Sequence, residues 1–139
     1  MDDNFSCKCI RLRKASNNVT KIYDSALIKV GLKITQFSTL KNIQKLGKTN
    51  IRNLSSELEL DRTTVLRNIV KLIEMDLVSY KYENDDKNKI IQLTTIGIKK
   101  LNEAIIIWEE TQHKYIKALN INNYEEIETI ISKISEINI

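Results

Sequence analysis

The side chains best suited to chemistry in this sequence follow Asp61. If residues 62–71 form an α-helix, its outward side holds cations, hydroxyls and an amide but no acid, at Arg62, Thr63, Thr64, Arg67, Asn68 and Lys71. Such side chains suit DNA, because Arg can bond guanine, Asn can bond adenine and Lys can hold a phosphate. A solvated helix face is the plain alternative and, taken alone, the commoner one. The neighbouring elements decide between them.

Two helices joined by a tight turn are expected here. Ile51, Leu54 and Leu58 recur at i, i+3 and i+7, which predicts a short helix whose wet side carries Arg52 and Ser55. The second helix should begin at Asp61, whose carboxylate can accept from free N–H groups of the first turn. Its apolar side is predicted to contain Val65, Leu66, Ile69, Val70 and Ile73.

A β-hairpin is expected directly after these helices. Residues 78–82 are rich in β-branched and aromatic side chains, residues 83–89 supply turn formers, and residues 90–94 return as a strand. Lys87 and Lys89 near its tip are candidates to enter a minor groove or hold the DNA backbone. Asp85 and Asp86 would be repelled by phosphate unless they orient a neighbouring cation, and ordinary turn chemistry explains them at least as well as that role. Helix, turn, helix and hairpin together predict a winged helix-turn-helix.

The composition of the whole chain indicates the class of protein that contains these elements. The chain has 139 residues, 42% apolar and 29% charged, which suits one globular domain with a sizeable core. Its net charge of +4 is uneven, because a stretch without acids holds Lys29, Lys33, Lys41, Lys45, Lys48 and Arg52. We find no secretory signal and no apolar run long enough to span a bilayer. With only two cysteines, the sequence favours a reducing cytoplasm and no membrane association.

The rest of the chain is expected to be mostly helical. Gly31 and Gly47 should each end a helical run, and Gly97 should mark the passage from the hairpin to another helix. The last run carries an apolar stripe of Ile127, Ile130, Ile131, Ile134 and Ile137. An apolar stripe of this size on the last helix of a small protein is expected to be buried against another surface. We therefore expect N- and C-terminal helices to pair across a two-fold axis as a homodimer.

With these residues in hand, the chain resembles the multiple-antibiotic-resistance regulator (MarR) family over nearly its whole length. The matching pieces are LRKASNNVTKIYDSAL, GLKITQFSTL, DRTTVLRNIVKLIEMDLV, and Asp85, Lys87 and Lys89 followed by LTTIG. The resemblance implies an obligate dimer that binds a near-palindromic operator and is often released by a small ligand or oxidation. Lys87 stands where the family usually has Arg, and Tyr80 where a basic residue is common, so wing contacts should be weaker or differently tuned.

The cysteines raise a separate hypothesis. Counted back from Ser16, Cys9 stands where the peroxide-sensing branch of the family keeps its reactive thiol, and Tyr23 matches a tyrosine that bonds it there. Arg13 occupies the place of a second such tyrosine. Arg11 and Arg13 would favour a thiolate at Cys9, whereas an inert cysteine near a dimer seam is the commoner case. Cys7, Cys9 and the single His113 fall short of four zinc ligands, so no metal is expected.

The resulting hypothesis is a mostly α, winged helix-turn-helix domain spanning residues 1–139, with residues 33–97 for DNA and residues 1–32 and 98–139 for dimerisation. Its function would be transcriptional regulation, most simply repression, with no cofactor. Tyr23, Phe37 and Trp108 are candidates to line an effector pocket, although such aromatic residues more often form core. Enzymatic motifs are lacking in the sequence. The alternative is a winged-helix protein-interaction module whose basic face docks an acidic partner.

Overall fold

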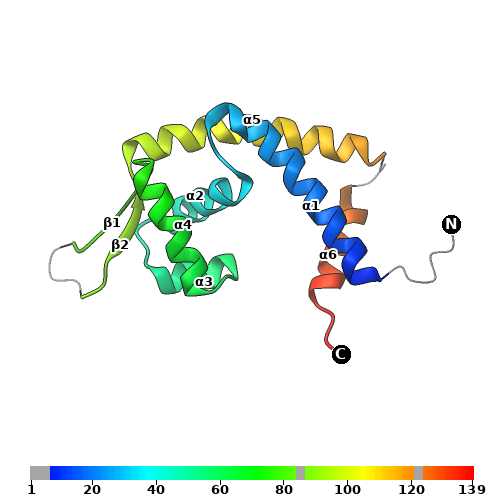
Figure 1. Cartoon of the computed structure of the whole chain (residues 1–139), viewed down its shortest axis with the longest axis horizontal. Helices are drawn as coiled ribbons and strands as arrows, with labels where there is room; N and C mark the ends of the chain where they lie inside the picture. The colour runs from blue at the N-terminus through cyan, green and yellow to red at the C-terminus, as the bar shows by residue number, and fades with distance from the viewer. Residues whose placement is uncertain (1–6, 84–86, 121–123) are drawn as a thin grey trace.

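The computed structural model describes residues 7–83, 87–120 and 124–139 (Figure 1). Its elements are α1 (Lys8–Leu27), a 3-10 turn η1 (Ile28–Val30), α2 (Ile34–Leu46), α3 (Ile51–Leu58), α4 (Arg62–Glu74), β1 (Val78–Lys81), β2 (Ile90–Leu93), α5 (Thr95–Ala118) and α6 (Tyr124–Ser135). The predicted mostly helical fold with a small β-wing is confirmed. None of the described helices combines the length and apolarity needed to cross a bilayer.

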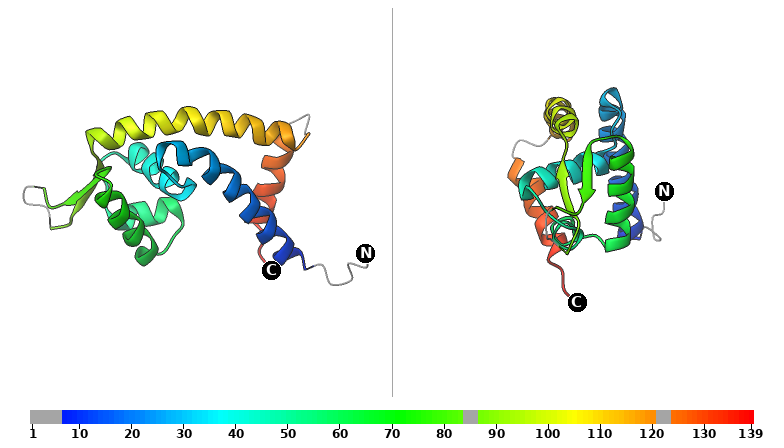
Figure 2. Two further views of the ribbon diagram at one scale, coloured as in Figure 1. Left: turned by 45° about the horizontal axis from the view of Figure 1, so that its top comes forward. Right: turned by 90° about the vertical axis from the view of Figure 1, so that its left-hand side faces the viewer.

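The long helix α5 organises the molecule. It runs from the wing at one end to α6 at the other, as the left view of Figure 2 shows. The second half of α1 packs against α5, and α2 packs beneath both helices. The wing, α3 and α4 form a lobe at one end, while α6 and the first turns of α1 lie at the other (Figure 1). The chain thus separates a winged-helix lobe from an extended pair of terminal helices.

The hydrophobic core lies inside the lobe and under the middle of α5. Among its fully buried side chains are Leu40 of α2, Leu54 of α3, Ile69 of α4 and Leu101 of α5. Burying each such side chain stabilises the fold by about 1.5–3 kcal/mol. The core therefore holds α3 and α4 against the rest of the lobe, so their outer faces are presented on a rigid base.

The wing is a two-stranded antiparallel sheet. Val78 pairs with Leu93 and Tyr80 with Ile91, so the predicted strand positions are confirmed to within one residue. Ile91 also exchanges two backbone hydrogen bonds with Thr49, with N–O distances of 2.9 and 2.7 Å. This bridge was not predicted from the sequence. It ties the base of the wing to the segment before α3 and fixes the hairpin relative to the helix-turn-helix.

The glycines act as predicted at two helix ends and differently at the third. Gly31 and Gly47 have φ values of 72° after η1 and α2, in the left-handed region that glycine tolerates best. Gly97 lies inside the first turn of α5, packed on the residue before β1. A Cβ atom at Gly97 would lie 2.0 Å from the carbonyl oxygen of Leu77. The residue is needed there for close backbone approach, beyond its expected role as a boundary.

Two expectations about buried faces were wrong. Leu66 and Val70 lie on the outer side of α4, with exposed fractions of 42% and 45%, and Leu72 is fully buried instead. The apolar residues of α4 cover a wider arc than its neighbours in the lobe can bury. Ser55 was expected on the wet side of α3 but is buried, and its hydroxyl donates to the carbonyl of Ile51 at 2.6 Å.

Candidate nucleic-acid interface

Side-chain caps set the start of both helices of the helix-turn-helix. The Asn50 side chain accepts from the backbone N–H of Asn53 at 2.8 Å, at the start of α3. The Asp61 carboxylate accepts from the N–H of Thr64 at 2.6 Å, which confirms Asp61 as the N-cap of α4. Hydrogen bonds from Thr64, with a smaller contribution from the charge of Arg67, hold the pKa of Asp61 below its usual value. The carboxylate therefore stays charged at the positive end of the helix dipole.

The outer face of α4 carries most of the predicted DNA-contacting side chains. Thr63, Arg67 and Lys71 are exposed, whereas Thr64 and Asn68 are half-buried on its flank. A shallow hollow on this face is lined by Thr63, Leu66, Arg67, Val70, Lys71 and Glu74. Glu74 is exposed at the end of α4 and adds one acid to this face. It lies beyond residues 62–71, whose outward side contains no acid.

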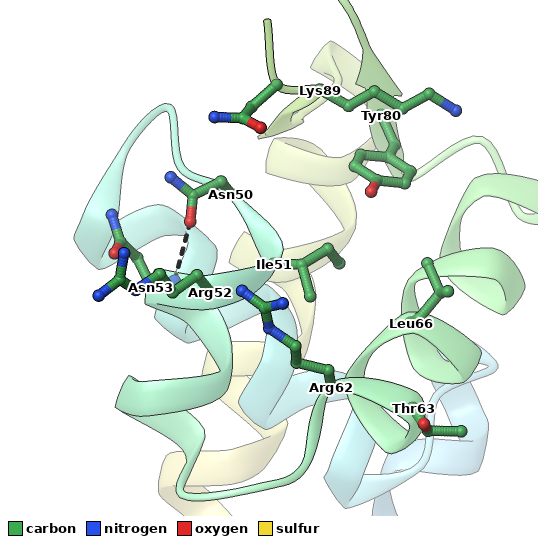
Figure 3. A pocket seen from close by; sticks show the side chains of 10 residues that line it. Asn50, Ile51, Arg52, Asn53, Arg62, Thr63, Leu66, Tyr80 and Lys89 are labelled. Carbon is green, nitrogen blue, oxygen red and sulfur yellow. Dashed lines mark hydrogen bonds between the residues drawn. The ribbon is translucent and has the colours of Figure 1, made fainter.

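A larger groove opens between α3, α4 and the wing. It has a volume of about 620 Å³ and is lined by Asn50, Ile51, Arg52, Asn53, Arg62, Thr63, Leu66, Tyr80, Asn88 and Lys89 (Figure 3). Among these described residues are three cations and no acid. Backbone N–H groups at the start of α3 add a positive dipole end to the same region. The groove is therefore chemically suited to a phosphate chain.

The wing side of this groove is built by Tyr80 and Lys89, which lie together in Figure 3. The ammonium of Lys89 is 5.0 Å from the centre of the Tyr80 ring and 5.8 Å from that of Tyr82. Cations at such distances are attracted by the electron-rich ring face. Lys87 is exposed on the hairpin, while Asp85 and Asp86 lie outside the described residues.

The structure thus brings together only part of the predicted set. Arg52, Arg62, Thr63 and Lys89 share the groove, while Arg67 and Lys71 lie on the adjoining face of α4. Ser55 is removed from the set, because its buried hydroxyl is already bonded within α3. The groove residues that the sequence did not predict are Asn50, Ile51, Asn53, Leu66, Tyr80 and Asn88. The cap position of Asn50 before an amphipathic run was the one available signal.

Two lysines of the basic stretch that precedes α3 form ion pairs. Lys45 pairs with Glu57 of α3, and the Lys48 ammonium lies 2.9 Å from a carboxylate oxygen of Glu83 in the wing. Both lysines remain largely exposed, with side-chain exposed fractions of 67% and 58%, so each ion pair offsets part of their charge without burying it.

A second, apolar cavity of about 540 Å³ lies between α1, α5 and α6. Tyr23 and Trp108 line it, together with Leu12, Ala15, Ser16, Val19, Thr20, Ile34, Tyr115, Ile127, Ile130, Ile131 and Ile134. The Tyr23 hydroxyl donates to the side-chain oxygen of Gln112 of α5. Phe37, the third predicted pocket residue, does not line the cavity: it is buried in the core with its ring stacked 5.7 Å from that of Trp108. The expectation for Phe37 was therefore wrong.

Both cysteines are free and exposed at the start of α1, Cys7 as its N-cap residue and Cys9 in its first turn. Tyr23 is fourteen residues further along the same helix, about 21 Å away at 1.5 Å per residue. A bond between Cys9 and Tyr23 of one chain is therefore excluded by distance. His113 is exposed, and within the described ranges no three potential ligands come together to hold a metal.

Comparison with known proteins shows what this arrangement resembles. Residues 32–97 match a family model described as a winged helix DNA-binding domain. A search of curated proteins returned no match. Among solved structures, the regulator MosR of M. tuberculosis in complex with DNA is 29% identical, with 92% of each chain covered and a TM-score of 0.79.

Two further structures share the fold at lower identity. BpsR of Bordetella bronchiseptica, whose DNA binding is regulated by 6-hydroxynicotinic acid, is 20% identical, with 99% of this chain and 100% of that chain covered and a TM-score of 0.84. A mutant of E. coli MarR complexed with operator DNA is 17% identical, with 88% and 89% covered and a TM-score of 0.80. Architecture is thus shared over nearly the whole chain, beyond the winged-helix lobe alone.

Proposed function

We propose that this chain, a winged-helix protein of the MarR family, is a sequence-specific, double-stranded DNA-binding transcriptional regulator that acts as a repressor in the cytoplasm. One observation carries the proposal: a groove with three cations and no acid among its described lining residues opens beside the exposed face of α4. The solved MosR and MarR complexes with DNA show that proteins of this architecture bind duplexes. The proposed function is DNA binding without enzymatic activity.

The geometry supports a division of labour along the DNA. An α-helix fits the major groove of DNA, and a hairpin can reach the adjoining minor groove. The DNA backbone between these two grooves would therefore lie in the protein groove, beside Arg52, Arg62 and Lys89. These cations and Lys87 would hold phosphates, which sets position without reading sequence. Backbone contacts of this kind give most of the affinity and make it depend on salt.

Base reading would fall to the outer face of α4. Arg67 can reach guanine O6 and N7, and Asn68 can bond adenine from its half-buried flank. Thr63 and Thr64 lie in the first turn, where hydroxyl and methyl groups can both contact base edges, and Lys71 is placed for phosphate. The capped, rigid start of α4 keeps these side chains in register.

Assembly as a homodimer is part of the same proposal. In the single chain, Ile130, Ile131, Ile134 and Ile137 of the C-terminal region are exposed, as are Ile10 and Leu12 of α1. Residues 1–32 and 98–139 would cover one another between two copies, leaving residues 33–97 of each for DNA. Two α4 helices related by a two-fold axis would read a pseudo-palindrome with half-sites one helical turn apart.

Release by a small molecule or by thiol oxidation completes the proposed regulation. The cavity lined by Tyr23 and Trp108 lies between α1, α5 and α6, and the part of it that the second chain leaves open would take a small apolar effector. Oxidation would act at the exposed Cys9, with any tyrosine partner supplied by the second chain. The alternative function is a protein-interaction module, in which the cationic groove would take an acidic partner instead of DNA.

Selection of bound duplexes from a random pool tests the function. We expect one pseudo-palindromic sequence to be enriched and its affinity to fall steeply with salt. Arg67→Ala should then weaken operator binding by about 1–3 kcal/mol and binding to random DNA much less. Asn68→Ala should act in the same way if its amide reads a base. Equal binding to all duplexes, or equal losses on operator and random DNA, would favour the protein-interaction alternative.

A further inference from the structure

Two large apolar side chains lie on the outer face of α4, among its cations. Leu66 and Val70 are 42% and 45% exposed, and the helical period places them with Thr63 in one stripe at i, i+3 and i+7. Leu66 lines both the groove and the hollow beside it, and Val70 lines the hollow. We call Thr63, Leu66 and Val70 the apolar stripe of α4.

This stripe has no role in the core of the lobe. Val65, Ile69 and Leu72 already pack the inner side of α4 and are fully buried. The stripe instead continues the surface that carries Arg62 and Arg67, so whatever these cations bind will also meet Leu66 and Val70. A partner that complements this whole surface must present apolar atoms beside negative charge.

The major groove of DNA has that combination at one base only. Thymine presents a C5 methyl group there, between two phosphate backbones, whereas adenine, guanine and cytosine present hydrogen-bond acceptors and donors but no methyl group. An aliphatic side chain placed against adenine, guanine or cytosine would bury a polar edge without a hydrogen bond, which is unfavourable. Against thymine, it would remove methyl surface from water on both sides.

We propose that Leu66 and Val70 read thymine methyl groups, so that the operator carries thymines opposite the middle of α4 in each half-site. The inference rests on the proposed function and adds a base preference to it. Arg67 and Asn68 read polar edges, while Leu66 and Val70 select thymine at neighbouring positions. Specificity then comes from an alternation of polar and apolar contacts along one helix.

Deoxyuridine provides a direct test, because it pairs as thymine does but lacks the C5 methyl group. In an operator selected from a random pool, each thymine is replaced in turn and the Kd of the wild-type protein is measured. We expect one or two thymines per half-site at which replacement weakens binding about fourfold, the effect of burying one methyl group. Other positions should respond less.

Protein variants assign the effect to the stripe. Leu66→Ala should abolish the thymine-to-uracil difference at one position and Val70→Ala at another, while Ile96→Ala, which truncates an exposed isoleucine outside α4 and outside the dimerisation segments, should preserve both. Full affinity for an operator in which deoxyuridine replaces every thymine would overturn the inference and leave the function standing. The same holds if the difference in Kd between thymine and uracil operators is unchanged in both Leu66→Ala and Val70→Ala. Failure to select any duplex would overturn the function and the inference together.

Discussion

The ammonium of Lys89 lies over the ring of Tyr80, 5.0 Å from its centre, where the two strands of the wing face α4. The ring offers the ammonium an electron-rich face, so Tyr80 positions the charge of Lys89. An exposed contact of this kind contributes about 0.5–1 kcal/mol. Its consequence is to hold Lys89 beside the groove.

Removal of the Lys89 charge should weaken DNA binding without changing base preference. We expect Lys89→Ala to lower affinity for operator and random duplexes alike and to reduce the slope of log K against log salt by about one unit. Lys87→Ala should do the same if its ammonium reaches phosphate. Lys117→Ala removes an exposed lysine from the end of α5 that lies away from the wing and should leave the slope unchanged. A slope unaltered in the Lys87 and Lys89 variants would remove these two lysines from the interface.

Substitution at Gly97 should destabilise the junction between the wing and α5. Alanine is normally the better helix former, but its Cβ would lie 2.0 Å from the Leu77 carbonyl oxygen, so backbone must move. We expect Gly97→Ala to reduce the free energy of unfolding by about 1–3 kcal/mol, the usual range for overpacking. Denaturant unfolding measures it, with Asn102→Ala at an exposed position of α5 as control. Equal or higher stability would show that the junction adapts.

The isoleucine stripe of α6 should govern assembly. Ile130→Asp or Ile134→Asp would place a carboxylate in the proposed dimer seam, where an unpaired charge costs several kcal/mol. We expect monomers or aggregates by analytical ultracentrifugation, and loss of operator binding. Ser132→Asp adds the same charge off the stripe on the same helix and should remain a dimer. Soluble dimers of unaltered affinity in the isoleucine variants would show that the stripe packs within its own chain.

The N-cap of α4 should make stability depend on acid. The folded-state pKa of Asp61 is lowered, so its contribution is present above the unfolded pKa of about 3.9 and is lost as the pH falls through the lower folded value. Asn caps a helix without titrating. The Tm of Asp61→Asn should therefore fall less than that of wild type between pH 6 and pH 3. Parallel curves for the two proteins would contradict this role.

Oxidation offers a test of the cysteines. If Cys9 is the regulatory thiol, an organic hydroperoxide should transfer one oxygen to it, giving a sulfenic acid and the corresponding alcohol. Attack of a thiol from the second chain on this sulfenic acid would then give an intersubunit disulfide and release water. Operator binding should then be lost in wild type and Cys7→Ser but not in Cys9→Ser. Indifference of all three proteins would leave a ligand-controlled or constitutive repressor.

Local chemistry determined much of this molecule directly from the sequence. The cap at Asp61 and the helix ends at Gly31 and Gly47 depend on residues next to each other in the chain, so they could be predicted without neighbours. The strand positions of the wing followed from alternation and turn formers in the same way. The family resemblance rested on the order of these local signals.

Only the tertiary structure decided which faces are covered. Apolar spacing predicts a stripe on α4 but not its edges, so Leu66 and Val70 are exposed where neighbouring elements stop, and Leu72 is buried. Phe37 stacks on Trp108 in the core instead of lining the cavity for the same reason. The approach of Gly97 to Leu77 joins segments twenty residues apart. Such contacts depend on how packed elements meet, which no local pattern encodes.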